Sequence, residues 1–278
     1  MDLNNQGSFG DRRPAPGPSP FPVAFVGGVP FQSTTLADAV DWIINVAAAQ
    51  RLPINVRLAN AWNVVLANND TDYGYLLTKA GINFPDGAPV ARFMNFNRGR
   101  RVRARRVRGP SLFAACLAAG VRPGTRHYLL GGSPMTLRRL QETLTERYPG
   151  VIIAGTYSPP FAPVDDSFIS DCMAEVRHTD ADLVWIGLGT PKQDIVGTAL
   201  ADGLQITALN VGAAFDFIAG TVVEAPAWVQ ASGFEWLFRL LSEPRRLWRR
   251  YLIGNVQFLA IAIRAALCAK RTNKSTDS

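Results

Sequence analysis

Histidine and cysteine are scarce in this 278-residue sequence, and their scarcity argues against several kinds of site. Only two histidines occur, His127 and His178, so a histidine-rich metal site is excluded and a Ser-His-Asp triad is poorly supported. The three cysteines, Cys116, Cys172 and Cys268, are odd in number and lack the spacing of metal ligands. We therefore expect free thiols in a reducing cytosol.

Long apolar runs and a signal peptide are also missing. No apolar run reaches the length of a membrane-spanning helix. The N-terminus is acidic and then polar, so we expect no secretion signal. Residues 1–20 are rich in Gly, Pro, Asn and Ser, which predicts a flexible N-terminal tail, and residues 271–278 are read as a polar tail.

The overall composition is that of a globular protein with an anionic partner. Hydrophobic residues make up 47% and charged residues 18% of the chain, which does not fit a disordered protein. The formal net charge is +7 and the pI is near 9.7. These values indicate nucleic acid, phospholipid headgroups or a phosphorylated ligand as partner.

Apolar strand-like runs alternate with helical segments along the chain. This alternation predicts an α/β fold with a mostly parallel sheet and helices on both faces. Ser33 or Thr34 is expected to cap the first helix. The strands are expected at residues 21–26, 54–58, 82–84, 127–130, 151–154, 183–186 and 206–210, and the helices at 35–50, 60–67, 72–80, 110–119, 134–148 and 166–177.

The stretch DLVWIGLGTPKQD, residues 182–194, combines a buried strand with a glycine turn and a helix start. Residues 183–186 suit a strand buried on both faces, and Gly187 and Gly189 break it. Pro191 suits the first helical position. Free backbone N–H groups at such a helix start favour phosphate. An ordinary strand–helix turn explains the same residues equally well.

Residues suited to chemistry follow several predicted strands, where α/β folds place their sites. Asp86 is the only carboxylate at its own strand end, in the turn Pro-Asp-Gly. It is either a plain turn aspartate or a general base for an attacking hydroxyl. The full set is Asn60, Asp86, Gly131, Gly132, Gln193 and Asp216.

Arginines alternate with aromatic and apolar residues over residues 225–252. If the chain is helical from Pro244, then Arg246, Arg249 and Arg250 share one face. Three interpretations stand side by side: a diphosphate clamp, a helix pair on a membrane surface, and a solvated packing face. The apolar segment 256–269 is too short and too interrupted to span a bilayer.

A second basic run, residues 98–108, holds seven arginines. It has no interleaved aromatic residues and no known nucleic-acid motif, so nucleic-acid binding is weakly supported. A solvated or lipid-facing loop is the preferred interpretation. Two Asp-x-Asp pairs, Asp70–Asp72 and Asp180–Asp182, are interpreted as structural, because the first begins a helix and the second enters its strand at the end opposite the expected site.

Several motifs, taken in order from about residue 22 to 260, resemble the WecG/TagA/CpsF glycosyltransferases. They are Asn60-Ala before an apolar helix, Pro85-Asp86-Gly87, Leu129-Leu-Gly131-Gly132, Gly187-Leu-Gly-Thr-Pro191-Lys-Gln193-Asp, Val211-Gly212-Ala-Ala-Phe-Asp216 with Ala219-Gly220, Glu235-Trp-Leu-Phe-Arg239, and Glu243-Pro-Arg-Arg246-Leu-Trp-Arg249-Arg-Tyr251.

The resemblance implies an inverting glycosyltransferase with a Rossmann-like GT-E core at residues 21–222 and a helical, membrane-associating appendage at residues 223–270. Such enzymes move a sugar from a UDP-sugar to a polyprenyl-diphosphate-linked sugar, in teichoic acid, common-antigen or exopolysaccharide synthesis. They act in the cytoplasm, peripherally on the inner face of the cell membrane, and no metal or other cofactor is expected. The resemblance makes Asp86 the catalytic base and assigns substrate binding to Asn60, Gly87, Gly131, Gly132, Pro191, Gln193, Gly212, Asp216, Arg239, Arg246 and Arg249.

Three departures from the family pattern leave the donor sugar open. Leu58 stands where the family usually has threonine, Ser111 where it often has aspartate, and Glu224 where a basic residue is common. The donor sugar is therefore either of the N-acetylmannosamine type or a hexose, as in a UDP-glucose-type hexosyltransferase of the same fold. A non-catalytic membrane- or nucleic-acid-binding protein is the remaining alternative. Without lipid, we expect a mobile or self-associated appendage, and hence a homo-oligomer in the second case.

Overall fold

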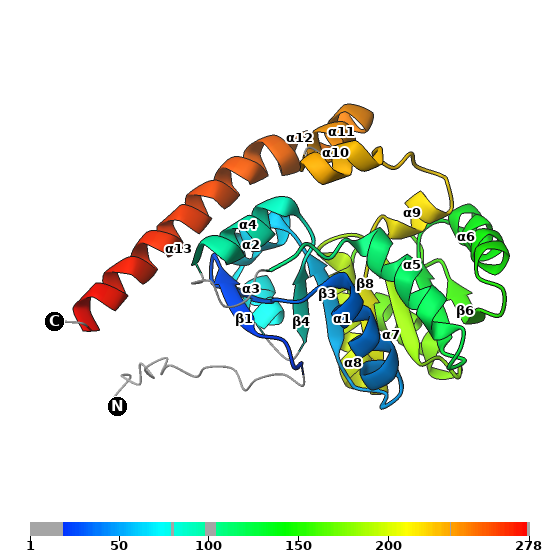
Figure 1. Ribbon diagram of the computed structural model, residues 1–278. Coiled ribbons are helices and arrows are strands. Elements are labelled where there is room, and N and C mark those ends of the chain that lie inside the picture. Colours follow the sequence, from blue (N-terminus) through cyan, green and yellow to red (C-terminus); the bar gives the residue numbers. More distant parts are fainter. Residues whose placement is uncertain (1–18, 79–80, 98–103, 234, 277–278) are drawn as a thin grey trace, which may run out of the picture.

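The computed structural model describes residues 19–78, 81–97, 104–233 and 235–276, without the side chains at 97, 231, 246 and 266–276. Within this part, six parallel strands form one sheet in the order β4-β3-β8-β7-β5-β6 (Figure 1). The predicted α/β fold with a parallel sheet is confirmed. The strands are β3 (Asn55–Ala59), β4 (Ile82–Pro85), β5 (Arg126–Gly131), β6 (Ile152–Tyr157), β7 (Leu183–Gly187) and β8 (Thr207–Asn210).

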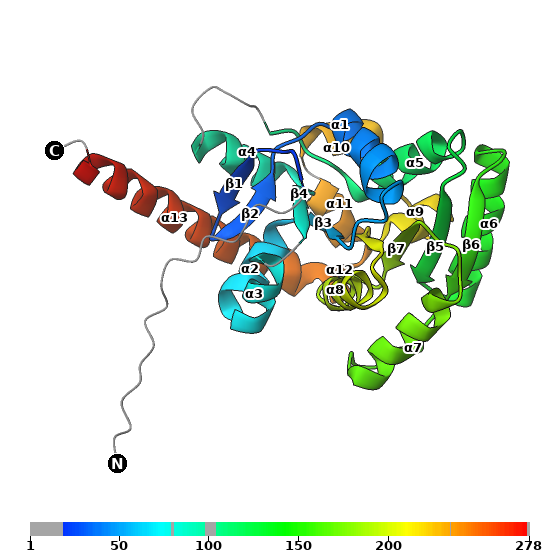
Figure 2. The ribbon, with the colours of Figure 1, turned by 90° about the horizontal axis from the view of Figure 1, so that it is seen from below.

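Helices cover both faces of the sheet, also as predicted. Figure 2 shows α1 and α5 on one side of the strands and α7 and α8 on the other. The central strand β7 is apolar on both faces because it serves both layers: Leu183 and Trp185 belong to one buried cluster, and Val184 and Ile186 to the other. The helices are α1 (Leu36–Trp42) with its π-helical continuation η1 (Ile43–Ala48), α5 (Gly109–Gly120), α6 (Pro134–Arg147), α7 (Asp166–Arg177) and α8 (Lys192–Leu204).

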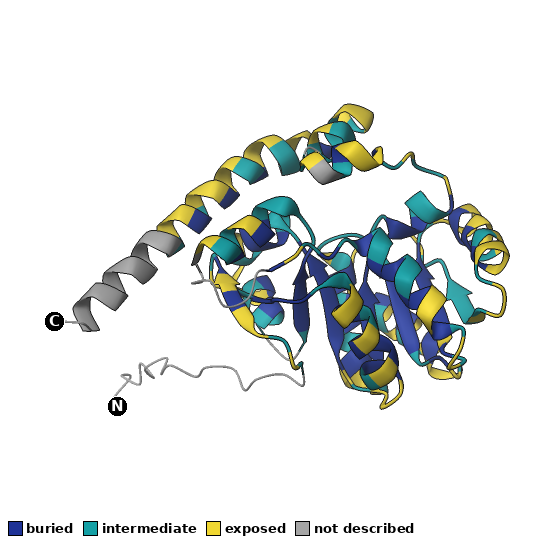
Figure 3. Ribbon diagram, viewed as in Figure 1, coloured by how far each residue is buried: buried dark blue, intermediate teal, exposed yellow. Residues whose placement is uncertain are grey.

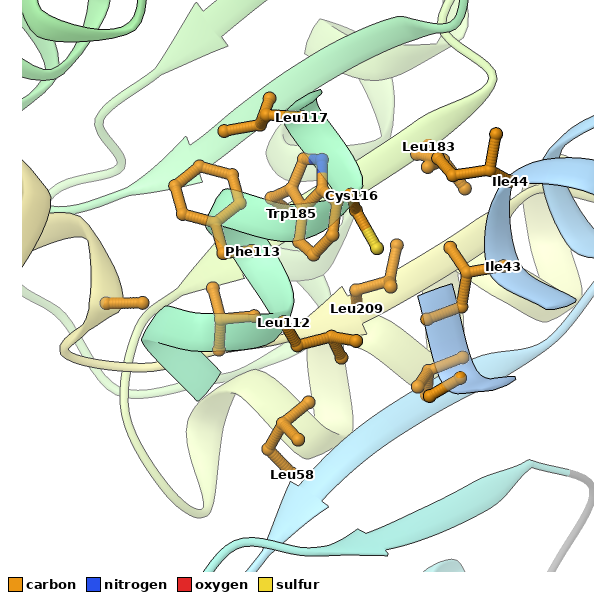
Figure 4. Close-up of a cluster of buried hydrophobic side chains, with 14 of the residues drawn as sticks. Ile43, Ile44, Leu58, Leu112, Phe113, Cys116, Leu117, Leu183, Trp185 and Leu209 are labelled. Atoms are coloured by element: carbon orange, nitrogen blue, oxygen red, sulfur yellow. The ribbon is translucent and has the colours of Figure 1, made fainter. Parts of the chain in front are cut away.

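The largest buried cluster lies between the sheet and the first helix layer (Figure 4). Trp185 is fully buried there and packs on Phe113, with ring centroids 4.8 Å apart. Its indole N–H donates to Nδ1 of His127 at 3.0 Å. Burial lowers the pKa of His127 to about 4, so the ring is neutral at physiological pH and can accept this bond. One of the two histidines is therefore part of the core.

The first helix, α1, is capped by a different residue from the two that were predicted. Thr35 is the N-cap, and its hydroxyl accepts the N–H of Asp38 at 3.2 Å, so the predicted capping by Ser33 or Thr34 is wrong. The predicted position of Pro191 is also wrong by one residue. Pro191 is the N-cap of α8, and the helix starts at Lys192.

β1 (Val23–Val26) lies within the strand predicted at residues 21–26, but two other elements were not predicted. The first is β2 (Val29–Gln32), which pairs with β1 in an antiparallel hairpin outside the main sheet. Its turn is Gly27-Gly28, with both φ angles positive, a pattern typical of short hairpins. The second element is α4 (Ala88–Asn97), which begins directly after Asp86 and Gly87. It converts the expected turn into a helix start.

The hairpin, α4, α2 (Ala61–Asn69), α3 (Thr71–Thr78) and the C-terminal helix enclose a second buried cluster. Phe258 and Ala262 of the C-terminal helix are almost completely buried in it. This packing attaches the end of the chain to the side of the sheet at β4. A short helix, α9 (Ala214–Ile218), follows β8.

The C-terminal helices lie across one edge of the body, and the last one extends well beyond it (Figure 1). They are α10 (Ala227–Ser232), α11 (Glu235–Ser242), α12 (Pro244–Trp248), its π-helical continuation η2 (Arg249–Ile253) and α13 (Gly254–Thr276). Their outer surface is largely exposed (Figure 3). Among the described residues, none of these or the other helices is both long and apolar enough to cross a membrane.

Candidate active site

A cavity of about 540 Å³ opens at the carboxyl ends of four neighbouring strands, β4, β3, β8 and β7. Parallel sheets place their binding sites at this edge. Residues of α11, α12 and η2 and the start of α13 form the opposite wall. The cavity therefore lies between the sheet and the C-terminal helices.

Asp86 lies on the floor of this cavity, directly after β4. Its N–H donates to the carbonyl of Ala59 at 2.8 Å, which fixes the turn against β3. Burial raises the pKa of the Asp86 carboxyl, and Glu235 raises it further. Arg106, Arg108 and Arg239 oppose this rise without cancelling it. A carboxyl group with a raised pKa is a better proton acceptor than an ordinary aspartate once it is ionised.

Asn60 lines the cavity from the end of β3 and also starts α2. Its Oδ1 accepts the N–H of Trp62 at 3.0 Å, and its own N–H donates to Oδ1 of Asn63 at 3.0 Å. This reciprocal capping fixes the side chain. Because the carbonyl oxygen serves the cap, the amide nitrogen is the group that Asn60 can offer to a ligand.

Gln193 and Gly212 meet at the ends of β7 and β8. Gln193 is only 4% exposed, and its Oε1 accepts the N–H of Gly189 at 3.1 Å. This bond occupies one of the turn N–H groups that the sequence suggested for phosphate. A Cβ atom at Gly212 would lie 3.4 Å from Oε1 of Gln193, so glycine leaves room for this side chain. Gly87 lines the cavity beside Asp86.

Asp216 lines the cavity from α9. Hydroxyl groups of Thr136 and Thr221 donate to its Oδ1 at 3.4 and 3.2 Å, so the carboxylate is held from two sides. Three other residues predicted to bind substrate, Gly131, Gly132 and Pro191, do not line the cavity. Gly131 instead allows the ends of β5 and β7 to approach, because a Cβ atom there would lie 2.7 Å from the carbonyl carbon of Gly187.

Two of the three predicted C-terminal arginines line the cavity, and the side chain of the third, Arg246, lies outside the described part of the chain. Arg239 of α11 and Arg249 of η2 both line the cavity, as does Arg250. The Arg239 guanidinium stacks over the ring of Phe217, 5.4 Å from its centroid. The backbone of Arg246 belongs to α12, but its side chain lies outside the described part of the chain.

The second basic run is not simply a solvated loop, and that expectation is wrong for its last part. Arg106 and Arg108 are mostly buried and line the cavity. Val107 between them is fully buried, and its N–H donates to the carbonyl of Pro85 at 2.9 Å. In such an extended segment alternate side chains point the same way, so both arginines face Asp86. Residues 98–103 lie outside the described part.

Sequence reasoning missed these two arginines and also Glu235. The alternation Arg-Val-Arg was the available signal, because a lone valine between arginines indicates an extended segment with one buried face. In the sequence, Glu235 stands out only as the first residue of the motif Glu235-Trp-Leu-Phe-Arg239. It is the first residue of α11, it lines the cavity, and it forms ion pairs with both Arg106 and Arg108.

The charge of the cavity favours a ligand with about two negative charges. Among the described residues, five arginines and three carboxylates line it, which leaves a surplus of two positive charges. No group of three His, Cys, Asp or Glu side chains gathers as a metal site in the same part of the chain. Arginine forks match phosphate oxygens, so the site can hold a diphosphate.

Both Asp-x-Asp pairs are structural, as predicted. Asp70 accepts the N–H groups of Asp72 and Tyr73 at the start of α3, both at 3.0 Å. At the amino end of β5, Asp182 accepts the N–H of Arg126 at 2.8 Å, and Asp180 pairs with the Arg126 side chain at 2.7 Å. Neither pair lines the cavity.

A buried polar network supports the cavity from below. Asp194, the residue after Gln193, is 1% exposed. Its carboxylate accepts from the hydroxyl of Tyr73 at 2.7 Å and from the amides of Asn210 and Asn63 at 3.0 and 3.4 Å. Asn63 in turn holds Asn60, so the network connects α8, α3 and β8 to one wall of the cavity.

Comparison with known families agrees with this site. A family model described as "Glycosyl transferase WecG/TagA/CpsF family" matches residues 24–272, which include every strand of the main sheet, all the cavity residues and most of α13. The family implies a nucleotide-sugar donor and a sugar acceptor. The chain belongs to the WecG/TagA/CpsF family of glycosyltransferases.

Proposed function

We propose that this enzyme transfers a sugar from a UDP-sugar to a polyprenyl-diphosphate-linked sugar, with inversion at the sugar carbon, in the synthesis of a cell-surface polysaccharide. The observation that carries the proposal is the placement of one carboxylate, Asp86, among arginines in a single cavity at the carboxyl edge of the sheet. A displacement of this kind needs a base for the acceptor hydroxyl and positive charge for the leaving UDP.

Asp86 is the proposed base. It would take the proton of the acceptor hydroxyl while that oxygen attacks the sugar carbon and the bond to UDP breaks. The surplus positive charge of the cavity supports a role in holding the diphosphate as its negative charge grows. In this proposal the arginines provide the charge stabilisation, and no metal ion or other cofactor is required.

The remaining cavity residues are proposed to hold the donor. Asn60, Gln193 and Asp216 lie at three different strand ends and are each fixed by hydrogen bonds, so they can orient a sugar or ribose with little loss of entropy. Leu58 and Pro110 give the same cavity an apolar wall. This wall is compatible with both donor classes, N-acetylhexosamine and hexose, and a donor panel would separate them.

We also propose that the C-terminal helices place the enzyme on the inner face of the cell membrane, where a polyprenyl-linked acceptor resides. Support comes from a series of exposed apolar side chains on these helices. Together with the net positive charge of the chain, they suit an anionic lipid surface. The series comprises Trp228, Leu237, Leu241, Trp248, Leu252, Ile253, Val256, Leu259 and Ile263.

The deciding experiment measures UDP release by the wild type and Asp86→Asn. A panel of UDP-sugars would be tested with a polyprenyl-diphosphate-sugar acceptor in detergent. We expect acceptor-dependent release from one donor, and a loss of at least about 100-fold in Asp86→Asn with UDP binding retained. Asp180→Asn is the matched control, because Asp180 is exposed at the opposite edge of the sheet.

Equal release by the wild type and Asp86→Asn would remove Asp86 as the base. No release from any donor, together with salt-sensitive binding of nucleic acid or vesicles, would favour a non-catalytic binding protein instead. Retained anomeric configuration in the product would contradict a direct displacement with a single base.

A further inference from the structure

An ion-pair cluster joins the catalytic core to the C-terminal helices beside Asp86. The two oxygens of Glu235 contact different arginines: Oε2 contacts Arg106, and Oε1 contacts Arg108 at 3.0 Å. Arg106 also donates to the carbonyl of Gln230 in α10 at 3.2 Å. Two successive C-terminal helices are therefore attached to one short segment of the core.

The cluster is well shielded from solvent. The side chains of Glu235 and Arg108 are 14% and 13% exposed. Burial alone would raise the pKa of Glu235, but hydrogen bonds from Arg108 and Arg106 outweigh it, so the pKa is lowered and the carboxylate is ionised. A shielded carboxylate that bridges two guanidinium groups restricts the rotamers of both arginines.

The same two arginines face the proposed base. The charged groups facing Asp86 are Arg106 and Arg108 from the core segment and Glu235 and Arg239 from α11. Glu235 thus acts on Asp86 in two ways, through its own negative charge and through the arginines that it holds.

We propose that Glu235 is a positioning residue that joins the docking of α10 and α11 to the charge around Asp86 by holding Arg106 and Arg108 in place. This inference rests on the proposed function for its catalytic meaning. The attachment of the helices and the titration of Asp86 can, however, be measured without any turnover.

Glu224 provides a matched control within the same cluster. It also pairs with Arg108, at 2.5 Å, but its side chain is 35% exposed and it does not line the cavity. It is not one of the groups that face Asp86. Glu224→Gln therefore removes a carboxylate from the same arginine without changing the charge beside the base.

The test follows the ¹³C carboxyl signal of Asp86 with pH in the full chain, labelled at aspartate and assigned with Asp86→Asn. Loss of the Glu235 charge alone would lower the Asp86 midpoint, whereas release of Arg106 and Arg108 would raise it. Because two positive charges are released for one negative charge lost, a positioning role predicts that the midpoint rises in Glu235→Gln. In Arg106→Gln a nearby positive charge is lost, and the midpoint should also rise. Glu224→Gln should leave it unchanged.

Hydrogen exchange of α10 and α11 is the second measurement. Glu235→Gln should exchange faster there than Glu224→Gln. A lower or unchanged Asp86 midpoint in Glu235→Gln would overturn the positioning role, even if exchange were faster, because it would mean that the arginines stay near Asp86 without Glu235. An unchanged exchange rate would overturn the docking role. In an active enzyme, the acid limb of the pH–rate profile should move with the Asp86 midpoint. If the midpoints behave as expected but no UDP is released, only the proposed function is contradicted.

Discussion

Removal of the Tyr73 hydroxyl should destabilise the protein in a pH-dependent way. Tyr73 is almost fully buried and donates to Asp194 at 2.7 Å, while its own oxygen accepts from Asn63 at 2.8 Å. Tyr73→Phe keeps the ring in its apolar cluster and removes only this oxygen. A hydrogen bond to a buried charged group contributes about 1.5–3 kcal/mol, so we expect a loss of about 2 kcal/mol at pH 8.

The pH dependence has a definite sign. Burial raises the pKa of Asp194 above its unfolded value, and the bond from Tyr73 is the largest contribution that lowers it. Without that bond the folded pKa rises further, so the variant loses more stability than the wild type as the pH increases through the folded pKa values. The difference between the two proteins should therefore be greatest at pH 8. It should shrink as the pH is lowered and Asp194 becomes protonated in both.

Urea unfolding followed by tryptophan fluorescence would measure this difference across the pH range. Tyr148→Phe is a suitable control, because Tyr148 is a partly buried tyrosine outside the Asp194 network. A difference that stayed constant with pH would show that Asp194 is not the group affected. A difference below about 0.5 kcal/mol at pH 8 would refute the assumed strength of the bond.

Three further predictions follow from single positions or from the site as a whole. Gly131→Ala should cost about 3 kcal/mol or more in thermal unfolding, because its φ is +118° and a Cβ atom would lie 2.7 Å from the carbonyl carbon of Gly187. Gly124→Ala, with φ +74° and only an ordinary contact of 3.9 Å to Cδ1 of Ile152, should cost only about 1 kcal/mol; equal costs would refute the steric reason. Cys116 and Cys172 are buried free cysteines, and burial raises the pKa of Cys172 to about 11, so neither should react with iodoacetamide at pH 8 before unfolding. EDTA should leave the UDP-release rate unchanged, since arginines supply the charge stabilisation in the proposed mechanism; a loss restored by Mg²⁺ would contradict it.

The sheet and its helices could be predicted from the sequence because the periodicity of apolar residues and the residue types of turns are local signals. Strand β7 and helix α7 are found where the apolar runs placed them. β1 falls within the predicted strand at residues 21–26, but β2 was missed. β2 contains Pro30 and pairs only with β1, outside the main sheet, so its four residues do not indicate a strand by themselves.

The residues of the candidate site also differ in whether local sequence signals could predict them. Asn60, Asp86 and Gln193 could be predicted because parallel strands end at one edge, and the order of the chain shows which residues follow each strand. For Arg106 and Arg108 the alternation around Val107 indicates only that one face of the segment is buried. That this face lines the cavity could not be predicted, because it depends on how the segment lies against β4 and on a carboxylate more than a hundred residues away. A run of arginines has the same composition whether it faces solvent or a cavity.

The distribution of charge between core and C-terminal helices gives the site a further property. The core contributes two arginines and two carboxylates to the cavity lining, which cancel. α11 and η2 contribute three arginines and Glu235, so the surplus of two positive charges comes entirely from the C-terminal helices. Long-range attraction of a dianionic ligand therefore depends on these helices being docked. Glu235 anchors these helices to Arg106 and Arg108. Its carboxylate lowers the positive charge of the cavity by one, but the docking that it supports brings the three arginines of α11 and η2 to the cavity.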